Sequence, residues 1–417
     1  MGKEVLEIIG GQQLVGKTRV YSAKNAVLPM LAGAMLTKEE VTIKDCPFIS
    51  DIDNMFKIRD VLSLNTKWIG RDIVASGSVC NNHIPESLAS VMRSSVFMLG
   101  PLLVETGDVK LHLPGGCKIG ARPIDIHLDG LEKMGAKIEI FENSVCCSAD
   151  RLRGAEIVLR YPSVGATENL ISASVKAKGE TTLIGVAREP EVVSFCEMLN
   201  AMGAKIVGAG TPVVKIKGVD HLYGATVKPV TDRIVAGTII LATALTGGRV
   251  NVEDCDISHL GALITKLVTN KIKIVSSLND LIVESDGIVN AFDVSSGPYP
   301  KFPTDLQPIA TAVLCQGTGH CVVEENVFEN RFSYISELKK MGAEISLAND
   351  CAVVRSSRLL GTSVVATDLR GGAGLVVAGL NAQGRTTVSG VEYIDRGYEK
   401  IEKIFKNLGA KISRKIV

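Results

Sequence analysis

Aromatic residues are scarce in this chain of 417 residues. Phe, Tyr and Trp make up 4% of it and Trp68 is the only tryptophan, although hydrophobic residues reach 46%. Aliphatic side chains must therefore build the cores, which favours many modest strands and helices over an aromatic sandwich. Because single cores stop growing at roughly 250–300 residues, two or more domains are expected.

A strong net charge and long apolar runs are also absent. Lys and Arg number 46 against 45 Asp and Glu, so the formal net charge is +1 and no global field attracts nucleic acid or an anionic membrane. No stretch reaches the roughly 20 apolar residues of a membrane span. Lys3, Glu4 and Glu7 stand where a secretory signal needs an apolar core. These absences predict a cytoplasmic protein.

The ten cysteines lack the spacing of a metal site. No CxxC or Cys/His pattern that would bind zinc is present. In a reducing compartment all ten are expected to be free thiols. Nine are interpreted as small buried hydrophobes, and Cys117 stands apart because of its surroundings.

A sixfold internal repeat organises the chain. The segment LEKMGAKIEI recurs in four copies with a glycine marker and in two degenerate copies with Asn65 or Lys271 at the marker position. The markers stand at 65, 135, 203, 271, 342 and 409, so the spacings are 70, 68, 68, 71 and 67 residues. Each copy predicts a helix that ends at a left-handed residue and is followed by an alternating strand.

Six such modules account for the whole chain, and each mixes strands with helices. Three modules in each of two similar domains is the natural division, with a break near Lys228-Pro229. The sequence therefore predicts an α/β (α+β) protein of two domains, with a binding site expected in a cleft between them.

A lysine begins one predicted helix. In SAKNAVLP, Lys24 and Asn25 follow a strand and lead into an apolar helix. A cation at a helix N-terminus opposes the helix dipole unless an anion is shared there. The position predicts an anion-binding role for Lys24, and the alternative is a solvated surface lysine.

Cys117 lies in the segment LPGGCKIGARP, which has three glycines and two prolines in eleven residues. This composition predicts an exposed, mobile loop. Lys118 and Arg122 stand close to the thiol, and such cations lower a thiol pKa and favour reactivity. The prediction is a reactive acid; a nucleophile and a thiol without function are the alternatives.

Asp305 lies between prolines in PKFPTDLQP. One interpretation is an ordinary helix N-cap. The other is a carboxylate that takes a proton from a substrate hydroxyl.

Two arginines follow aspartates near the end of the chain, Arg370 in TDLRGG and Arg396 in IDRGY. Each could simply pair with its neighbouring aspartate at small energetic gain. Together with Lys24, Arg93 and Arg122 they would instead supply cations for a substrate with several phosphate and carboxylate charges.

These segments, in this order, resemble the enolpyruvyl transferase family over the full length of the chain. The motifs are SAKNAVLP, LGPLL, LPGGCKIGARPIDIH, YPSVGATEN, AREPEVV, TDRIVAGT, YPKFPTDLQP, VFENRF, TDLRGGAGLVVAGL and DRGYEKIE. The loop cysteine is typical of the branch that serves bacterial wall synthesis and separates it from the shikimate-pathway branch. The resemblance implies two inside-out α/β barrel domains, each of three βαβαββ pseudo-repeats. It places residues 22–228 in the first domain, and residues 1–21 and 229–417 in the second.

The resemblance also implies roles for individual residues. Cys117, Asp305 and Lys24 would be catalytic. Lys24, Arg122 and Arg396 would hold phosphoenolpyruvate, and Asn25 and Asp305 would contact a sugar. The uridine and diphosphate contacts would be Arg93, Arg122, Pro123, Ile124, Asp125, Ile126, Ser163, Val164 and Gly165. The other implied substrate contacts are Arg160, Val327 and the supporting cations Arg331 and Arg370.

The implied reaction transfers the enolpyruvyl group of phosphoenolpyruvate to the 3-hydroxyl of UDP-N-acetylglucosamine and releases phosphate. Asp305 would help to remove the hydroxyl proton, while Cys117 would protonate the methylene carbon. The resemblance implies no metal, no cofactor, no nucleic-acid or membrane partner, and a monomer or weak homo-oligomer.

Some positions depart from the family pattern. Tyr21 and Ser22 replace a usual serine and glycine, Lys301 replaces a usual glycine, and Leu306 a usual methionine. These changes leave two alternatives open: an enolpyruvyl transferase with a different nucleotide acceptor, and a catalytically silent paralogue that binds the nucleotide sugar.

Overall fold

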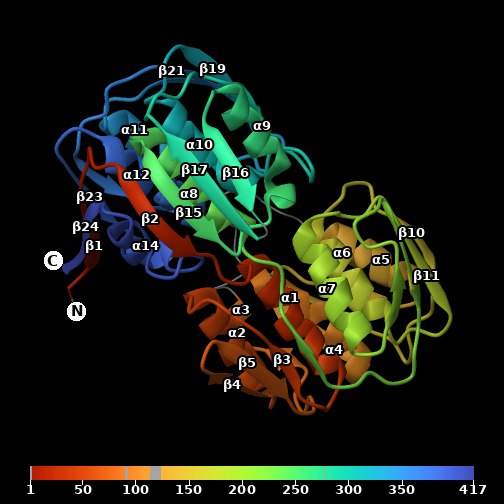
Figure 1. The fold of residues 1–417 in the computed structure, drawn as a ribbon. Helices are drawn as coiled ribbons and strands as arrows, with labels where there is room; N and C mark the ends of the chain where they lie inside the picture. Colours follow the sequence, from red (N-terminus) through yellow and green to blue (C-terminus); the bar gives the residue numbers. More distant parts are fainter. Residues whose placement is uncertain (1, 90–92, 113–123, 278) are drawn as a thin grey trace. The chain divides into compact units, whose positions relative to one another are not determined.

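The computed structural model describes residues 2–89, 93–112, 124–277 and 279–417, which form two compact units (Figure 1). The first unit contains the described residues within 22–230, and the second those within 1–21 and 231–417. The division falls between residues 230 and 231: Val230 O accepts from Ala23 N in the first unit, whereas Asp232 N donates to Tyr21 O in the second.

Three four-stranded sheets lie in the first unit. They are β14 (Ala225–Val227), β3 (Val41–Ile43), β5 (Asp72–Ser76) and β4 (Asn65–Ile69); β6 (His83–Ile84), β7 (Asp108–His112), β9 (Ser144–Ser148) and β8 (Lys137–Ile140); and β10 (Glu156–Val158), β11 (Glu180–Ile184), β13 (Val213–Lys217) and β12 (Lys205–Val207). The helices are α1 (Lys24–Gly33), α2 (Ser50–Val61), α3 (Glu86–Ala89), α4 (Leu99–Thr106), α5 (Asp125–Lys133), α6 (Val164–Ser174) and α7 (Pro190–Ala201), with 3-10 helices η1 (Ala34–Leu36) and η2 (Arg93–Met98).

The second unit also has three four-stranded sheets. They are β2 (Leu14–Arg19), β15 (Gly248–Glu253), β17 (Asp280–Ser285) and β16 (Lys273–Ser277); β18 (Val294–Ser295), β19 (His320–Glu324), β21 (Cys351–Arg355) and β20 (Glu344–Ala348); and β22 (Ser363–Val365), β23 (Arg385–Ser389), β1 (Glu4–Ile9) and β24 (Lys411–Ile416). The helices are α8 (Arg233–Thr246), α9 (Gly261–Thr269), α10 (Gln307–Leu314), α11 (Ile335–Lys340), α12 (Leu369–Asn381), α13 (Val391–Ile394) and α14 (Ile401–Asn407), with 3-10 helices η3 (Ile257–Leu260), η4 (Thr304–Leu306) and η5 (Arg331–Tyr334).

All six sheets share one topology. The first strand pairs parallel with the second, the second antiparallel with the fourth, and the fourth antiparallel with the third, as in β10-β11-β13-β12. This is the order that a βαβαββ module produces. Distant strands complete three of the sheets: β14 pairs with β3 in the first unit, and in the second unit β2 pairs with β15 and β1 lies between β23 and β24. The predicted fold of two inside-out α/β domains with three pseudo-repeats each is confirmed.

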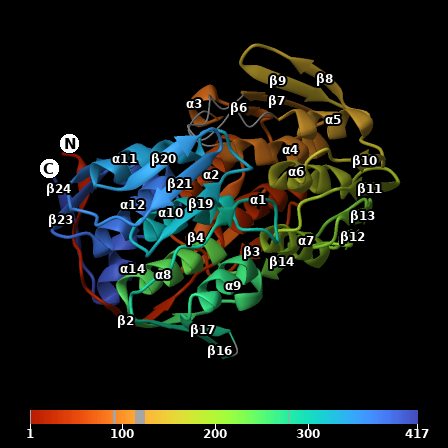
Figure 2. The same ribbon diagram turned by 90° about the horizontal axis from the view of Figure 1, so that it is seen from above.

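The helices, rather than the sheets, occupy the centre of each unit. In the second unit every residue of α10, and residues 370–380 of α12, are buried, while strands such as β19 alternate buried residues with more exposed ones (Figures 1 and 2). A helix that is apolar on all sides must be surrounded by protein, whereas an alternating strand has one face in water. The sequence of apolar α8, α10 and α12 therefore dictates the inside-out arrangement.

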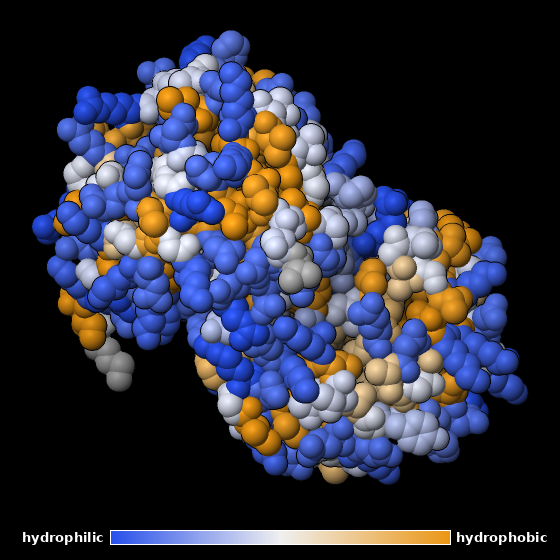
Figure 3. Space-filling model, viewed as in Figure 1, coloured by the Kyte–Doolittle hydropathy of each residue, from blue (hydrophilic) through white to orange (hydrophobic). Residues whose placement is uncertain are grey.

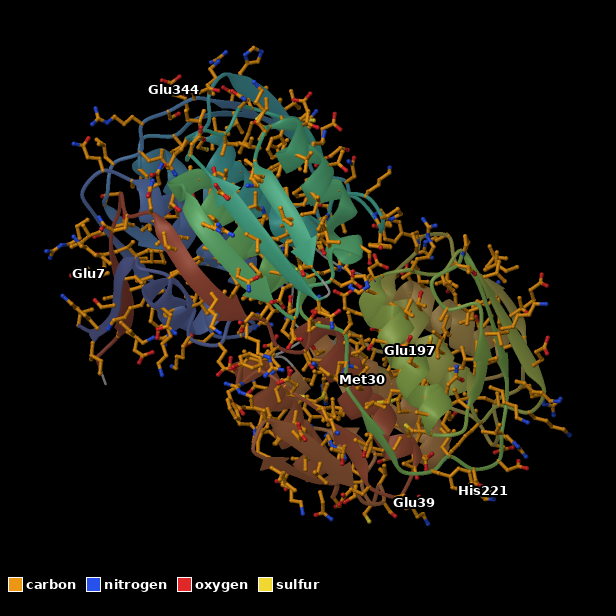
Figure 4. All side chains as sticks on the ribbon, viewed as in Figure 1. Glu7, Met30, Glu39, Glu197, His221 and Glu344 are labelled. Carbon is orange, nitrogen blue, oxygen red and sulfur yellow. The ribbon has the colours of Figure 1, made fainter. Side chains whose placement is uncertain are left out.

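The outer faces of the sheets are polar. On β1, Leu6 and Ile8 are buried while Glu7 points outward and accepts hydrogen bonds from Lys415 at 2.8 Å and Arg385 at 3.4 Å (Figure 4). Polar residues cover most of the face drawn in Figure 3, with apolar residues gathered over β16 and β17 of the second unit. Among the helices that the structure describes, none is long and apolar enough to cross a membrane.

The repeated helix ends adopt one hydrogen-bond pattern. At the marker Gly135, with φ of 94°, the amide donates to Glu132 O, and the next amide, of Ala136, donates to Leu131 O. The same pair of bonds recurs at markers 203, 271, 342 and 409. This is a Schellman motif, in which a left-handed residue satisfies the last carbonyls of a helix.

The predicted marker of the first copy is wrong by two positions. Ser63, with φ of 65°, is the left-handed residue after α2, and Asn65 is the first residue of β4. Asparagine tolerates the left-handed conformation better than serine, but in this copy Ser63 adopts it. Arg59 holds this turn from the core: it is fully buried and donates to Asn65 O and to Leu31 O. Burial lowers the pKa of Arg59 to about 10.

Lys271→Gly is expected to stabilise the protein by about 1 kcal/mol, because an L-residue in the left-handed region costs roughly 1–2 kcal/mol and glycine does not. Lys271 has a φ of 65°. Thermal unfolding should show a rise in Tm of about 2–4 °C. Lys271→Ala is the matched control, since it removes the same side chain but keeps Cβ, and an equal gain there would contradict the explanation.

The cysteines are mostly, but not all, buried. Cys46, Cys147, Cys196, Cys255, Cys315 and Cys321 are buried free thiols. Burial raises the pKa of these six, for example to about 12 for Cys196, so they remain protonated at neutral pH. The interpretation as buried hydrophobes is wrong for Cys80, which is exposed in the segment after β5, and only partly right for Cys146 and Cys351.

Candidate active site

Asp305 lies on η4 in the second unit, and its carboxylate accepts hydrogen bonds from two buried arginines. Arg331 Nη2 donates to its Oδ1 at 2.7 Å, and Arg370 donates to its Oδ2 from Nε at 3.0 Å and from Nη2 at 2.9 Å. The arginine side chains are 2% and 3% exposed, while that of Asp305 is 24% exposed. The capping interpretation of Asp305 is wrong, because α10 has no side-chain cap and the carboxylate binds the arginines instead.

Arg370 stands in the first turn of α12, next to the ring of Tyr398 and the carboxylate of Asp305. Its guanidinium carbon lies 5.4 Å from the ring centroid of Tyr398, whose hydroxyl is 2.8 Å from Thr238 Oγ1. Burial disfavours the charged form, but Asp305, Tyr398 and Asp232 outweigh it, so the pKa of Arg370 is raised. Nη1 of Arg370 is buried without a hydrogen-bond partner among the described residues. A buried cation with an unused donor is suited to bind an anion.

The aspartates next to the two arginines have other partners. Asp368 is the N-cap of α12 and accepts from the amides of Arg370 and Gly371. Asp395 receives two bonds of 2.7 Å from Arg414 on β24. Arg396 follows α13 and is half-buried. The interpretation that Arg370 simply pairs with its neighbour Asp368 is therefore wrong. Asp395, the neighbour of Arg396, is bound by Arg414.

Lys24 is the first residue of α1 in the first unit. Its Nζ lies 3.0 Å from Oδ2 of Asp51 on α2, and the two side chains are 12% and 1% exposed. The alternative of a solvated lysine is wrong. Asp51 is the anion that makes a cation tolerable at this helix N-terminus, and Asn25 follows, half-buried, in the first turn.

The N-terminus of α6 carries the segment from Ser163 to Gly165. Ser163 is the N-cap and accepts from the amide of Ala166. A Cβ on Gly165 would lie 3.4 Å from the ring of His127 on α5, so the two helices approach closely here. His127 Nδ1 is 3.1 Å from Asn169 Nδ2 on α6, which fixes the ring beside Gly165.

Arg160 forms an ion-pair cluster near the start of α5. It pairs with Asp125 and, at 3.2 Å, with Asp129, and all three side chains are largely exposed. Ile124 precedes α5 and Ile126 follows Asp125 within it. Exposed pairs of this kind contribute little to stability, so Arg160 can change partners at small cost.

Cys117, Arg122 and Pro123 lie outside the described residues, together with Lys118. Arg93 begins η2 in the first unit. Val327 lies in the second unit just after β19, where its amide donates to Glu325 Oε1 at 2.9 Å.

The departures from the family pattern fit the structure. Ser22 is fully buried and donates to Lys44 O at 2.9 Å, and Lys301 is exposed. Leu306 is buried against α8, where Gly237 leaves room: a Cβ there would lie 2.5 Å from Leu306 Cδ1. Among the described residues no group of three or more His, Cys, Asp or Glu side chains could hold a metal ion.

Glu168 on α6 was not expected from the sequence. It is fully buried, and neither carboxyl oxygen has a hydrogen-bond partner among the residues that the structure describes. Burial raises the pKa of Glu168 well above its ordinary value of 4.5, and the charges of Glu191 and Glu189 raise it further. The carboxyl therefore keeps its proton above the pH at which an exposed glutamate ionises. No local motif signals this, because the burial depends on the packing of α6 against α7.

Glu168→Gln is expected to flatten the pH dependence of stability. Above its ordinary pKa of 4.5, Glu168 ionises in the unfolded chain but keeps its proton in the folded one, so stability falls as pH rises toward the folded pKa. Glutamine is neutral in both the folded and the unfolded chain, so the variant does not lose stability in this way as the pH rises. The Tm of the variant should match the wild type near pH 5 and exceed it at pH 8, where 1 kcal/mol corresponds to about 2–4 °C. Glu197→Gln, on the exposed face of α7, is the control and should show no such difference (Figure 4).

A family model described as EPSP synthase (3-phosphoshikimate 1-carboxyvinyltransferase) matches residues 8–405. The chain belongs to this family. The resemblance to enolpyruvyl transferases is thus confirmed. Among the relatives, the UDP-N-acetylglucosamine 1-carboxyvinyltransferase 2 of Carboxydothermus hydrogenoformans is 43% identical over 99% of each chain. The UDP-N-acetylglucosamine 1-carboxyvinyltransferase of Koribacter versatilis is 45% identical, with 98% of this chain and 95% of that protein covered.

Solved structures of other enolpyruvyl transferases share the fold. The enolpyruvyl transferase NikO from Streptomyces tendae superposes with a TM-score of 0.90 over 100% of both chains at 23% identity. An EPSP synthase from Acinetobacter baumannii gives a TM-score of 0.76 at 16% identity, covering 99% of this chain and 100% of the other.

Proposed function

We propose that this chain transfers the enolpyruvyl group of phosphoenolpyruvate to the 3-hydroxyl of UDP-N-acetylglucosamine, with release of phosphate, the first committed step of peptidoglycan precursor synthesis. The observation that carries the proposal is the identity of 42–45% over almost the whole chain to relatives named for this activity. The buried arginines around Asp305 support it, because both substrates are anions.

The second unit would supply the base and part of the anion site. Asp305 is partly exposed and firmly oriented by two guanidinium groups, as a group that accepts the proton of a sugar hydroxyl must be. Nη1 of Arg370 has no hydrogen-bond partner among the described residues, which supports a contact with a carboxylate or phosphate oxygen. Arg396 would join it in holding phosphoenolpyruvate, and Val327 would contact the nucleotide sugar.

The first unit would supply Lys24 for phosphoenolpyruvate and Asn25 for the sugar. The uridine and diphosphate would contact Arg93, Arg122, the residues 123–126, Arg160 and the α6 N-terminus from Ser163 to Gly165. Backbone amides at a helix N-terminus favour anions, which supports a diphosphate contact near Ser163.

The chemistry would proceed by addition and elimination. Asp305 takes the proton of the 3-hydroxyl, the sugar oxygen bonds to C2 of phosphoenolpyruvate, and the Cys117 thiol gives its proton to C3. The product of this step is a tetrahedral ketal. Loss of a proton from C3 and departure of phosphate then leave the enol ether. Fixed cations stabilise the negative charge of the departing phosphate.

A phosphate-release assay tests the proposal. Purified protein with phosphoenolpyruvate and UDP-N-acetylglucosamine is expected to release phosphate continuously, whereas omission of either substrate should stop release. Release with another nucleotide sugar alone would favour a different acceptor. Absence of release with every acceptor, together with binding of UDP-N-acetylglucosamine, would favour the silent paralogue. A cytoplasmic location and a monomer or weak homo-oligomer stay predictions.

A further inference from the structure

Glu325 links two segments that carry proposed sugar contacts. It follows β19 and is 4% exposed. Its Oε1 accepts from the amides of Val327 at 2.9 Å and Phe328 at 3.2 Å, and the Thr304 hydroxyl lies 3.0 Å from both oxygens. The residue after Thr304 is Asp305. One buried carboxylate thus joins the Val327 segment to the turn that carries the proposed base.

Thr304 is held from its other side as well. Its carbonyl accepts from Arg331 Nε at 3.1 Å and Nη2 at 2.9 Å, and the same Nη2 donates to Asp305 Oδ1 at 2.7 Å. The hydroxyl of Thr304 therefore binds Glu325 while its carbonyl binds Arg331. With both ends fixed, the turn η4 can present Asp305 in only a narrow range of orientations.

The burial of the Glu325 carboxylate costs free energy, and its hydrogen bonds connect two segments that an apolar residue could not connect. Three neutral donors, one hydroxyl and two amides, are the partners of its carboxylate. Burial of a carboxylate has a high desolvation cost, which such bonds only offset. An apolar residue would fill the same space without that cost, but it could not connect Thr304 to Val327.

We infer that Glu325, acting through the Thr304 hydroxyl, is a positioning residue that sets the Asp305 carboxylate relative to the Val327 segment. The inference rests on the proposed function, because it assigns a purpose to the position of Asp305. Misplacement of a catalytic group by about 1 Å can cost on the order of 100-fold in rate. Loss of one hydrogen bond that orients the turn is expected to cost less, about 10-fold.

Thr304→Val tests the inference, because valine keeps the shape of threonine and removes only the hydroxyl. The kcat for phosphate release should fall about 10-fold and the KM for UDP-N-acetylglucosamine should rise several-fold. The KM for phosphoenolpyruvate should stay within about twofold, since the Thr304 hydroxyl bonds to Glu325 and not to a proposed phosphoenolpyruvate contact. Thr304→Ser restores the hydroxyl and should recover kcat to within about threefold of the wild type.

Two further variants separate positioning from stability. Thr243→Val makes the same change at a fully buried site of α8, where the hydroxyl donates to Ile239 O, and should leave both constants unchanged. Glu325→Gln keeps the size but not all acceptors, so it should act in the same direction as Thr304→Val. The double variant should lose less than the product of the two single effects.

Three outcomes would overturn the inference: wild-type kcat in Thr304→Val, no recovery in Thr304→Ser, or an equal rise in both KM values. If Thr304→Val does not fold, Glu325→Gln decides by the same criteria. Failure of the wild type to release phosphate would overturn the proposed function and this inference with it. An active wild type with an unimpaired Thr304→Val would overturn the inference alone.

Discussion

Asp305→Asn is expected to lower kcat for phosphate release by about 10²–10⁴-fold, the usual contribution of a general base. Asparagine keeps the shape and one acceptor oxygen but cannot take the proton of the sugar hydroxyl. It also removes the negative charge between Arg331 and Arg370, which are almost completely buried. The measurement is steady-state phosphate release with both substrates saturating.

Loss of that charge should also lower stability, because breaking a buried ion pair leaves uncompensated charge. Rates must therefore be measured well below the Tm of the variant. Asp293→Asn is a matched control in the same unit, where the carboxylate accepts a backbone hydrogen bond from Val322 N at 2.8 Å. A kcat of Asp305→Asn within about threefold of the control would exclude the role as base, since a general base contributes about 10² or more.

Cys117→Ser is expected to reduce net turnover below detection, a loss of about 10²–10⁴-fold or more. A hydroxyl is a far weaker acid than a thiol, whose reference pKa is ~8.5, and the neighbouring Lys118 and Arg122 are expected to lower the pKa of Cys117 further. Serine should therefore fail to protonate C3 of phosphoenolpyruvate. Turnover by the serine variant at a rate close to the wild type would contradict the acid role.

Fosfomycin, an epoxide, is expected to inactivate the protein by alkylating Cys117. Peptide mass spectrometry of the folded protein should find the adduct at Cys117, while the six buried thiols, with raised pKa values, stay unmodified. Exposed Cys80 is the internal control for general thiol reactivity. Equal modification of Cys80 and Cys117 would argue against a specially activated thiol.

Local features of the fold could be predicted from the sequence. A helix that ends at a left-handed residue and an alternating strand are both encoded within about ten residues, so the markers at 135, 203, 342 and 409 identified the repeat and its module. The first marker failed because Ser63 carries no glycine signal, and its turn is held by Arg59 from the core.

Contacts between distant segments were not predictable. Lys24 is separated from Asp51 by 27 positions and Asp305 from Arg370 by 65, and no spacing rule connects them. The resemblance supplied Lys24, Asp305 and Arg370 as site residues, but not the pairing of their charges. Glu168 and Glu325 were missed for the same reason, since a glutamate in a sequence is ordinarily a solvated residue and only tertiary packing buries these two.

Because β1 lies between β23 and β24, the order of synthesis decides when the last sheet of the second unit can form. β1 pairs with β24 over residues 4–9 and 411–416, and Lys3 and Val417 exchange backbone hydrogen bonds of 2.8 and 3.0 Å. The last sheet of the second unit therefore cannot close on a ribosome until the final strand has emerged, whereas all strands of the first unit are made by residue 227. During translation the N-terminal strand stays unpaired until β23 has been made, and its pairing is complete only with β24. Because the two ends lie side by side, a circularly permuted chain that joins them and opens at another loop should complete this sheet early.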